Sequence, residues 1–351
     1  MLHNFSRIFI ILLSFAVYGS SGPDPTLYIE ETKLIGSYHE NGEVEMFLGL
    51  PFARPPIGEM RWKRPHPWMP IPEEEIYVNK FKPACFQNQR IVLWYKRLIQ
   101  DFGGDPNTFA VPDFSEDCLY LNLWRPKGKK NNLPVIVYIH GGSNKAGWAY
   151  EPNYLGHNIA SKDFILISIP YRLGVFGFFS HPEVESPNLA LFDQILALKW
   201  ISKYVSSFGG DPSNITLIGE SAGAGGISHL IASPLSEGLF QRAVHQSGGS
   251  SFTYPASASE VKNLANEFSK SFQDSSIKNL RTVGAEEILK ISEKIYANHY
   301  FNYINDDLSL KEHLSESYKE GKIQSVDLIV GSNNDEWSLY FDGNVDIELW
   351  L

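Results

Sequence analysis

The stretch Ile215-Thr216-Leu217-Ile218-Gly219-Glu220-Ser221-Ala222-Gly223 decides how this chain folds. The apolar, β-branched residues 215–218 predict a buried strand, and the apolar residues beyond Gly223 have helical spacing. Between the two segments stands one serine, with a glycine two residues before it and another two residues after it. A G-x-S-x-G pattern between a strand and a helix predicts a nucleophile elbow.

The elbow has a physical rationale. A turn this sharp strains the serine backbone, and the positions two residues away on either side have no room for a side chain. The turn also presents Ser221 Oγ beside the first N–H groups of the helix, which favour developing negative charge. We therefore expect Ser221 to be a nucleophile. A chance glycine–serine turn is the alternative for the five-residue pattern taken alone.

A second glycine-rich segment lies some 80 residues earlier in the chain. Residues 133–139 predict another buried strand, which ends in His140-Gly141-Gly142-Ser143. Glycines directly after a strand let backbone N–H groups face a ligand closely, as an oxyanion hole requires. His140 precedes the serine in the chain, so we expect it to be structural rather than a catalytic base.

The remaining pattern alternates strands and helices. Strands are expected at 164–169 and 326–331, a helix at 189–205, and a hairpin around Asn41-Gly42. This alternation predicts an α/β fold with a mostly parallel sheet and helices on both faces. The glycines at 223, 225 and 226 do not form G-x-G-x-x-G, which excludes a dinucleotide fold. Residues 257–315 look polar and helical and carry no recognisable chemistry.

Composition narrows the class of protein. The 351 residues are 43% hydrophobic, which is enough for one large core or two domains. The net charge is −10 and the cations are scattered, so we expect no nucleic-acid partner.

The N-terminus resembles a targeting segment. In residues 1–22 a basic start precedes an apolar run at 8–17 and then small residues, which predicts a signal peptide and a secreted protein. A membrane anchor is the alternative, but about ten apolar residues are too short to span a bilayer. Residues 24–351 would then form the folded domain, with no membrane span.

Only two cysteines occur in the chain, Cys85 and Cys118. In an exported protein they predict one disulfide, whose loop would contribute roughly 3–4 kcal/mol. Two buried free thiols are the alternative. We expect no metal and no cofactor, because no second Cys or His pair stands at ligand spacing. The aromatic residues between the cysteines line a substrate gorge or pack at the surface, and the sequence favours neither. Asn214-Ile215-Thr216 is a glycosylation sequon, although it adjoins a buried strand.

Several motifs together resemble the type-B carboxylesterase/cholinesterase family. They are the elbow, SEDCLYLN at 115–122, FGGDP at 208–212 and NDE at 334–336. The resemblance covers residues 27–249 and resumes near 326. It implies the α/β-hydrolase fold and cofactor-free hydrolysis of small-molecule esters, with Ser221 as the nucleophile and Glu336 as the acid of the triad.

The resemblance also assigns supporting roles. It implies an oxyanion hole from the N–H groups of Gly142, Ser143 and Ala222, with Gly141 adjacent, and it places Glu220 and Ser247 beside the site. It further implies a Cys85–Cys118 disulfide and two structural ion pairs, Arg61–Glu116 and Arg172–Asp193.

Three departures from the family pattern matter. Ser143 replaces a common third glycine, which a small residue tolerates because the donor is its N–H group. Thr108 stands where cholinesterases use a tryptophan to hold a quaternary ammonium, which favours a general ester over a choline ester. In this fold the catalytic histidine follows the acid, yet all ten histidines, the last being His313, precede Glu336.

We therefore expect the sequence to cover the N-terminal two-thirds of the family domain. Without the histidine, the 351-residue chain should be nearly inactive, with a loss on the order of 10⁴–10⁶ in rate. A non-catalytic, neuroligin-like adhesion homologue and a truncated inactive product are the alternatives. Intact Ser221 and Glu336 argue against the adhesion homologue.

Overall fold

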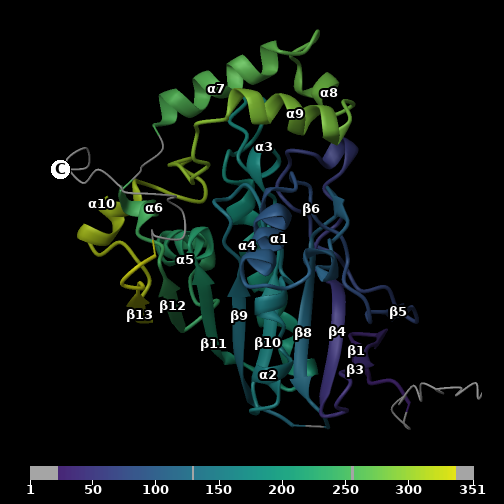
Figure 1. Ribbon diagram of the computed structural model, residues 1–351. Coiled ribbons are helices and arrows are strands. Elements are labelled where there is room, and N and C mark those ends of the chain that lie inside the picture. Colours follow the sequence, from purple (N-terminus) through teal and green to yellow (C-terminus); the bar gives the residue numbers. More distant parts are fainter. Residues whose placement is uncertain (1–22, 129, 254–256, 337–351) are drawn as a thin grey trace, which may run out of the picture.

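The computed structural model describes residues 23–128, 130–253 and 257–336; the expected signal peptide at 1–22 lies outside them. An eight-stranded sheet in the order β13-β12-β11-β9-β10-β8-β4-β3 forms the centre of the molecule (Figure 1). Its strands are β3 (Ser37–Tyr38), β4 (Val44–Pro51), β8 (Tyr120–Pro126), β9 (Leu133–Ile139), β10 (Ile165–Ile169), β11 (Gly210–Glu220), β12 (Arg242–Gln246) and β13 (Asp327–Gly331).

The sheet is parallel on one side and antiparallel on the other. β13, β12, β11, β9 and β10 pair in parallel, whereas β10–β8, β8–β4 and β4–β3 pair antiparallel. The expected parallel sheet is therefore confirmed for the half that carries the elbow. The expected hairpin at Asn41-Gly42 joins β3 to β4, and so short a connection requires antiparallel strands.

Both faces of the sheet are covered. All five residues of β10 are buried, which is typical of a strand packed on both sides. Its odd-numbered residues belong to the large core, together with buried residues of α4 (Leu189–Tyr204) and α5 (Ala222–Ala232). Leu166 faces the opposite way and packs with Trp124 and with α2 (His157–Ala160).

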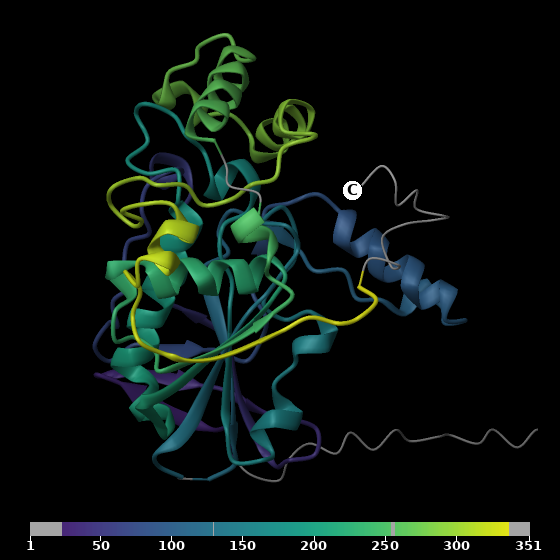
Figure 2. The ribbon, with the colours of Figure 1, turned by 90° about the vertical axis from the view of Figure 1, so that its left-hand side faces the viewer.

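Smaller elements surround the sheet. β1 (Thr26–Ile29), β2 (Thr32–Ile35) and β5 (Glu75–Tyr77) form a second sheet, and β6 (Ala84–Cys85) pairs with β7 (Phe114–Ser115). Between β6 and β7 the chain forms α1 (Arg90–Asp101), which stands out from the body in Figure 2. No helix in the described ranges is both long and apolar enough to cross a membrane.

A helical layer lies beyond the end of the sheet toward which β11 and β12 run (Figure 1). It consists of α7 (Ala258–Lys270), α8 (Ile277–Leu280) and α9 (Ala285–Ile295), and the short helices α3 (Gly174–Gly177), α6 (Ser250–Thr253) and α10 (Leu314–Lys319) lie nearer the sheet. The helical expectation for 257–315 is right up to α9 and wrong for residues 299–313, which are irregular.

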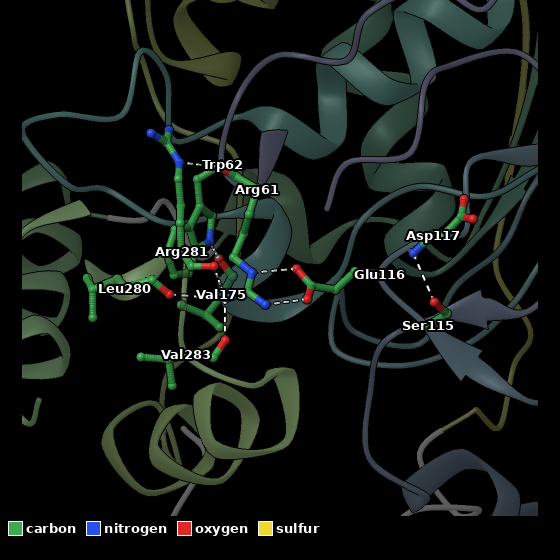
Figure 3. A network of polar contacts seen from close by, with 9 residues as sticks. All are labelled: Arg61, Trp62, Ser115, Glu116, Asp117, Val175, Leu280, Arg281 and Val283. Carbon is green, nitrogen blue, oxygen red and sulfur yellow. Dashed lines mark hydrogen bonds and ion pairs between the residues drawn. The ribbon is translucent and has the colours of Figure 1, made fainter. Parts of the chain in front are cut away.

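A buried arginine ties this helical layer to the body (Figure 3). Arg61 makes a bidentate ion pair with Glu116, at 2.6 Å from Nε to Oε1 and 2.5 Å from Nη2 to Oε2. Its Nη1 donates to the carbonyl oxygens of Leu280 and Val283, at 3.0 and 2.6 Å. One guanidinium therefore joins the disulfide loop to the segment that follows α8.

The second expected ion pair is also present. Arg172 donates to both carboxylate oxygens of Asp193 at 2.8 Å, and its backbone N–H donates to Oδ2 at 3.0 Å. Its Nη1 donates to the carbonyl oxygen of Lys63 at 2.9 Å. Both side chains are buried, so the pair fixes the loop after β10 against α4.

The Arg61 network predicts a stability effect. Glu116→Gln leaves a buried guanidinium without its counter-charge, and we expect the free energy of unfolding to fall by about 3 kcal/mol. Urea unfolding followed by circular dichroism measures the change. The control is Glu75→Gln, which breaks an exposed pair with Lys33 and should change nothing measurable. Equal midpoints for the two variants would contradict a structural role for the buried pair.

Candidate active site

Ser221 sits at the junction of β11 and α5 with a strained backbone, at φ 54° and ψ −120°. A Cβ atom on Gly219 would lie 2.6 Å from the carbonyl carbon of Gly223, and a Cβ on Gly223 would lie 2.1 Å from the carbonyl oxygen of Ile139. Both contacts are with backbone, which cannot move aside cheaply. The structure thus explains why both flanking positions are glycine, and the expected elbow geometry is present.

The glycine-rich loop after β9 meets the elbow directly. β9 and β11 are parallel neighbours with Ile139 opposite Gly219, so both strands end at the same edge. A Cβ on Gly141 would lie 3.2 Å from Ser221 Cβ and 2.8 Å from the carbonyl oxygen of Glu220. The loop backbone therefore passes within contact distance of Ser221.

The expected donors of the oxyanion hole follow Gly141. Gly142 has φ +103° and Ser143 has φ +58°. The carbonyl oxygen of Gly142 accepts the N–H groups of Lys145 and Ala146, each at 3.0 Å, and so turns away from the site. Within the described ranges, the N–H groups of Gly142 and Ser143 make no hydrogen bond. Ala222 begins α5, where the first N–H groups of a helix have no intrahelical partner.

Glu336 is held at the ends of β12 and β13. Ser247 Oγ and the backbone N–H of Asn333 both donate to Glu336 Oε1, the latter at 2.6 Å. These two hydrogen bonds lower the pKa of Glu336, the bond from Ser247 having the larger effect. The N–H of Ser247 in turn donates to the carbonyl oxygen of Gly331 at 2.8 Å. Ser247 therefore positions an ionised carboxylate.

Glu220 is the second carboxylate of the site. Burial raises its pKa, and the nearby charges of Glu336 and Glu151 raise it further. Glu220, Ser247 and Glu336 line one wide cavity of about 670 Å³. Glu336 is therefore the more readily ionised of the two carboxylates, because its charge is hydrogen-bonded and that of Glu220 is opposed.

No histidine in the described part of the chain is hydrogen-bonded to Ser221 or Glu336. His140 stacks on Tyr171, with Nδ1 2.9 Å from the carbonyl oxygen of Gly141. His229 lies in α5, with Nδ1 2.7 Å from the carbonyl oxygen of Gly225. Burial lowers the pKa of each to about 4, so both are neutral packing residues near neutral pH. The described residues also contain no cluster of three or more His, Cys, Asp or Glu that could hold a metal.

Sequence reasoning missed Asn144, which fixes the glycine-rich loop after β9, here called the oxyanion loop (residues 140–146). The side chain is buried; its Nδ2 donates to the carbonyl oxygen of Phe301 at 2.8 Å. The backbone carbonyl oxygen of Asn144 accepts the N–H of Gly174 at 2.7 Å. The only sequence signal is an asparagine directly after the glycine-rich run, and its partner lies 157 residues further on.

The expected disulfide is present, with Cys85 and Cys118 both buried and their Cα atoms 4.9 Å apart. Within its loop, Tyr95 and Phe109 pack with Trp148 in a small separate core, whereas Phe102 is 88% exposed. These aromatic residues therefore include both packed and exposed members.

Two further predicted positions lie away from the elbow. Thr108 is exposed, and its hydroxyl donates to the carbonyl oxygen of Asp105 at 2.7 Å. Asn214 belongs to β11 and accepts a hydrogen bond from Arg242 Nη1 at 2.6 Å.

The elbow yields a substitution test. Gly223→Ala forces a Cβ against the backbone of Ile139, and we expect a loss of roughly 1–3 kcal/mol in the free energy of unfolding. Gly249→Ala is the matched control, because its Cβ meets nothing within 4 Å. Urea midpoints for the two variants are compared, and a Gly223→Ala midpoint equal to that of the control would rule out the steric explanation.

The buried histidines yield a pH test. Their folded pKa of about 4 lies below the unfolded value of about 6.5, so between these pH values the unfolded chain binds more protons. The contribution of these two histidines to the free energy of unfolding is therefore complete above about pH 6.5. It falls toward pH 4 by roughly 3 kcal/mol for each histidine. Urea unfolding at pH 7.5, 5.5 and 4.5 measures the slope. His229→Gln should lower the slope by about one proton, and an unchanged slope would refute this assignment.

Comparisons with known proteins identify the family. Residues 23–348 match the carboxylesterase family. The chain is 35% identical over 326 residues to para-nitrobenzyl esterase of Bacillus subtilis (strain 168), covering 88% of this chain and 62% of that protein. It is 34% identical over 322 residues to cholinesterase of Mus musculus, covering 85% of this chain and 51% of that protein.

The solved structures of similar proteins have the same fold. A structure titled PNB esterase superposes with a TM-score of 0.81 at 33% identity, covering 92% of this chain and 65% of the other. The chain thus spans about half to two-thirds of the length of these relatives. The chain has the α/β-hydrolase fold and belongs to the carboxylesterase family.

Proposed function

We propose that the protein hydrolyses small-molecule carboxylic esters through an acyl-enzyme formed on Ser221. The observation that carries the proposal is the contact between the strained elbow and the loop whose N–H groups at Gly142 and Ser143 have no hydrogen-bond partner among the described residues. A nucleophile and oxyanion donors at one strand edge are the two parts that acyl transfer needs first.

Each residue has a defined role in the proposal. Ser221 Oγ attacks the ester carbonyl carbon, and the N–H groups of Gly142, Ser143 and Ala222 hold the oxyanion. The tetrahedral intermediate then releases the alcohol and leaves an acyl group on Ser221. Water attacks that acyl group, releases the carboxylic acid and restores the serine.

Proton transfer requires an imidazole. The base accepts the Ser221 proton, passes it to the leaving alcohol, and is stabilised as a cation by Glu336. No described histidine contacts either residue. We therefore infer that the 351-residue chain by itself hydrolyses esters on the order of 10⁴–10⁶ times more slowly than a complete triad.

Added imidazole tests this proposal. Hydrolysis of p-nitrophenyl butyrate by the chain should rise with imidazole concentration, because the free base takes the Ser221 proton. Ser221→Ala is measured under the same conditions, since imidazole also cleaves the ester in solution. We expect a Ser221-dependent rate about tenfold above this background. Glu336→Gln should reduce that rate while leaving the background unchanged.

The result separates an enzyme from a binding protein. Identical rates for the chain and Ser221→Ala at every imidazole concentration would contradict a nucleophilic Ser221. They would favour the non-catalytic alternative instead.

We also propose secretion. The apolar segment at 8–17, followed by small residues, supports export, and the Cys85–Cys118 disulfide suits an oxidising compartment. Asn214 would then be available as a glycosylation acceptor.

A further inference from the structure

A cavity of about 120 Å³ lies between α9, α3 and the disulfide loop. In Figure 1, α3 lies directly below α9. Phe86, Phe176 and Phe301 form apolar parts of its wall. The polar residues that line it are Asn88, Arg90, Lys145, Ser292, Glu293 and Tyr296. A cavity needs about 10–15 Å³ of such space to admit one water molecule, so this one has room for a small polar group with a few methylenes.

Lys145 is the half-buried cation of this cavity. Its Nζ donates to the carbonyl oxygen of Tyr296 at 3.2 Å and lies 5.7 Å from the centre of the Phe301 ring. An ammonium group has three donors, so this single hydrogen bond leaves it capacity for a ligand. Burial lowers the pKa of Lys145, and the charge of Arg90 lowers it further, while Glu293 raises it.

Charge in the cavity is therefore unbalanced. Lys145 and Arg90 supply two positive charges, and Glu293 supplies one negative charge, which is already hydrogen-bonded by Asn88. Because the two cations repel one another, an anion bound between or beside them is favourable.

Tyr296 holds the lysine through its backbone. It caps α9, and its backbone carbonyl oxygen accepts the hydrogen bond from Lys145 Nζ. Its hydroxyl is fully buried, lies near the charge of Glu267 and is not exposed to the cavity.

The cavity adjoins the proposed oxyanion hole. The N–H of Lys145 donates to the carbonyl oxygen of Gly142, and its Cα is within about 7 Å of that of Ser143 along the chain. Asn144 ties the same loop to Gly174 and Phe301, which both line the cavity. Lys145 and the proposed oxyanion donors therefore belong to one hydrogen-bonded turn.

Building on the proposed ester hydrolysis, we propose that this cavity receives a carboxylate carried by the substrate. Lys145 forms an ion pair with this carboxylate, and the aromatic wall covers its methylenes. The protein would accordingly prefer esters with an anionic acyl group.

Binding is measured by isothermal titration calorimetry with the 351-residue chain. Two probes differ only in charge: monomethyl glutarate, which ends in a carboxylate, and methyl 4-carbamoylbutanoate, which ends in a carboxamide. We expect the carboxylate probe to bind at least about tenfold more tightly. Lys145→Gln should abolish this preference, and Lys145→Arg should retain most of it. Equal affinities in the unmodified chain would overturn the proposal.

A second lysine variant controls for the loss of one positive charge. Lys162→Gln, just beyond α2 at the opposite end of the sheet, should leave the preference for the carboxylate probe unchanged. Equal loss of the preference in Lys145→Gln and Lys162→Gln would show that net charge, and not the cavity, selects the carboxylate.

The two proposals fail in different ways. Binding of the probes needs no turnover, so Ser221→Ala should bind them as the unmodified chain does. Loss of imidazole-dependent hydrolysis with an intact carboxylate preference would refute the enzyme mechanism alone. Hydrolysis with equal affinity for both probes would refute the carboxylate site alone.

Discussion

Backbone contact between two parallel strand ends is the constraint on which the site depends. Register places Ile139 of β9 opposite Gly219 of β11, so the chain leaves both strands at one level. Glycines then let the two turns approach until only a few ångströms separate the backbone of Gly141 from Ser221. An added Cβ at Gly223 meets only backbone atoms, and one at Gly141 meets the carbonyl and carboxylate oxygens of Glu220. Ser221 and the N–H groups proposed as oxyanion donors are therefore positioned by backbone packing, which is more rigid than side-chain contacts.

Buried polar side chains hold the loops around that contact. Arg61 and Arg172 each donate hydrogen bonds to one carboxylate and to the backbone carbonyl groups of a segment distant in sequence. Asn144 does the same without charge, joining the oxyanion loop to Phe301 and Gly174. Such groups satisfy loop carbonyls that would otherwise be buried without partners. These hydrogen bonds hold the helical layer in place over the strand ends.

The local parts of this arrangement could be predicted from the sequence, and the non-local parts could not. The elbow, the glycine loop and β11 are determined by residues within about ten positions of one another, so their pattern predicts their geometry. The link from Lys145 to Tyr296 spans 151 positions, and no periodicity marks it. Residues 299–313 looked helical by composition, yet they follow an irregular path because Asn188 and Asn144 hold their carbonyl oxygens. Tertiary hydrogen bonds there outweigh local propensity.

Charge around Ser221 is divided between two sides. Glu220, Glu336 and the buried Glu151 interact on the side of β11, where each raises the cost of another negative charge. Lys145 and Arg90 oppose one another on the side of α9, where each raises the cost of another cation. In the proposed mechanism, a cationic imidazole would be stabilised on the first side and an anionic substituent on the second. An ester oriented with its anionic end toward α9 would satisfy both, because the catalytic proton then moves toward the carboxylates and away from the cations.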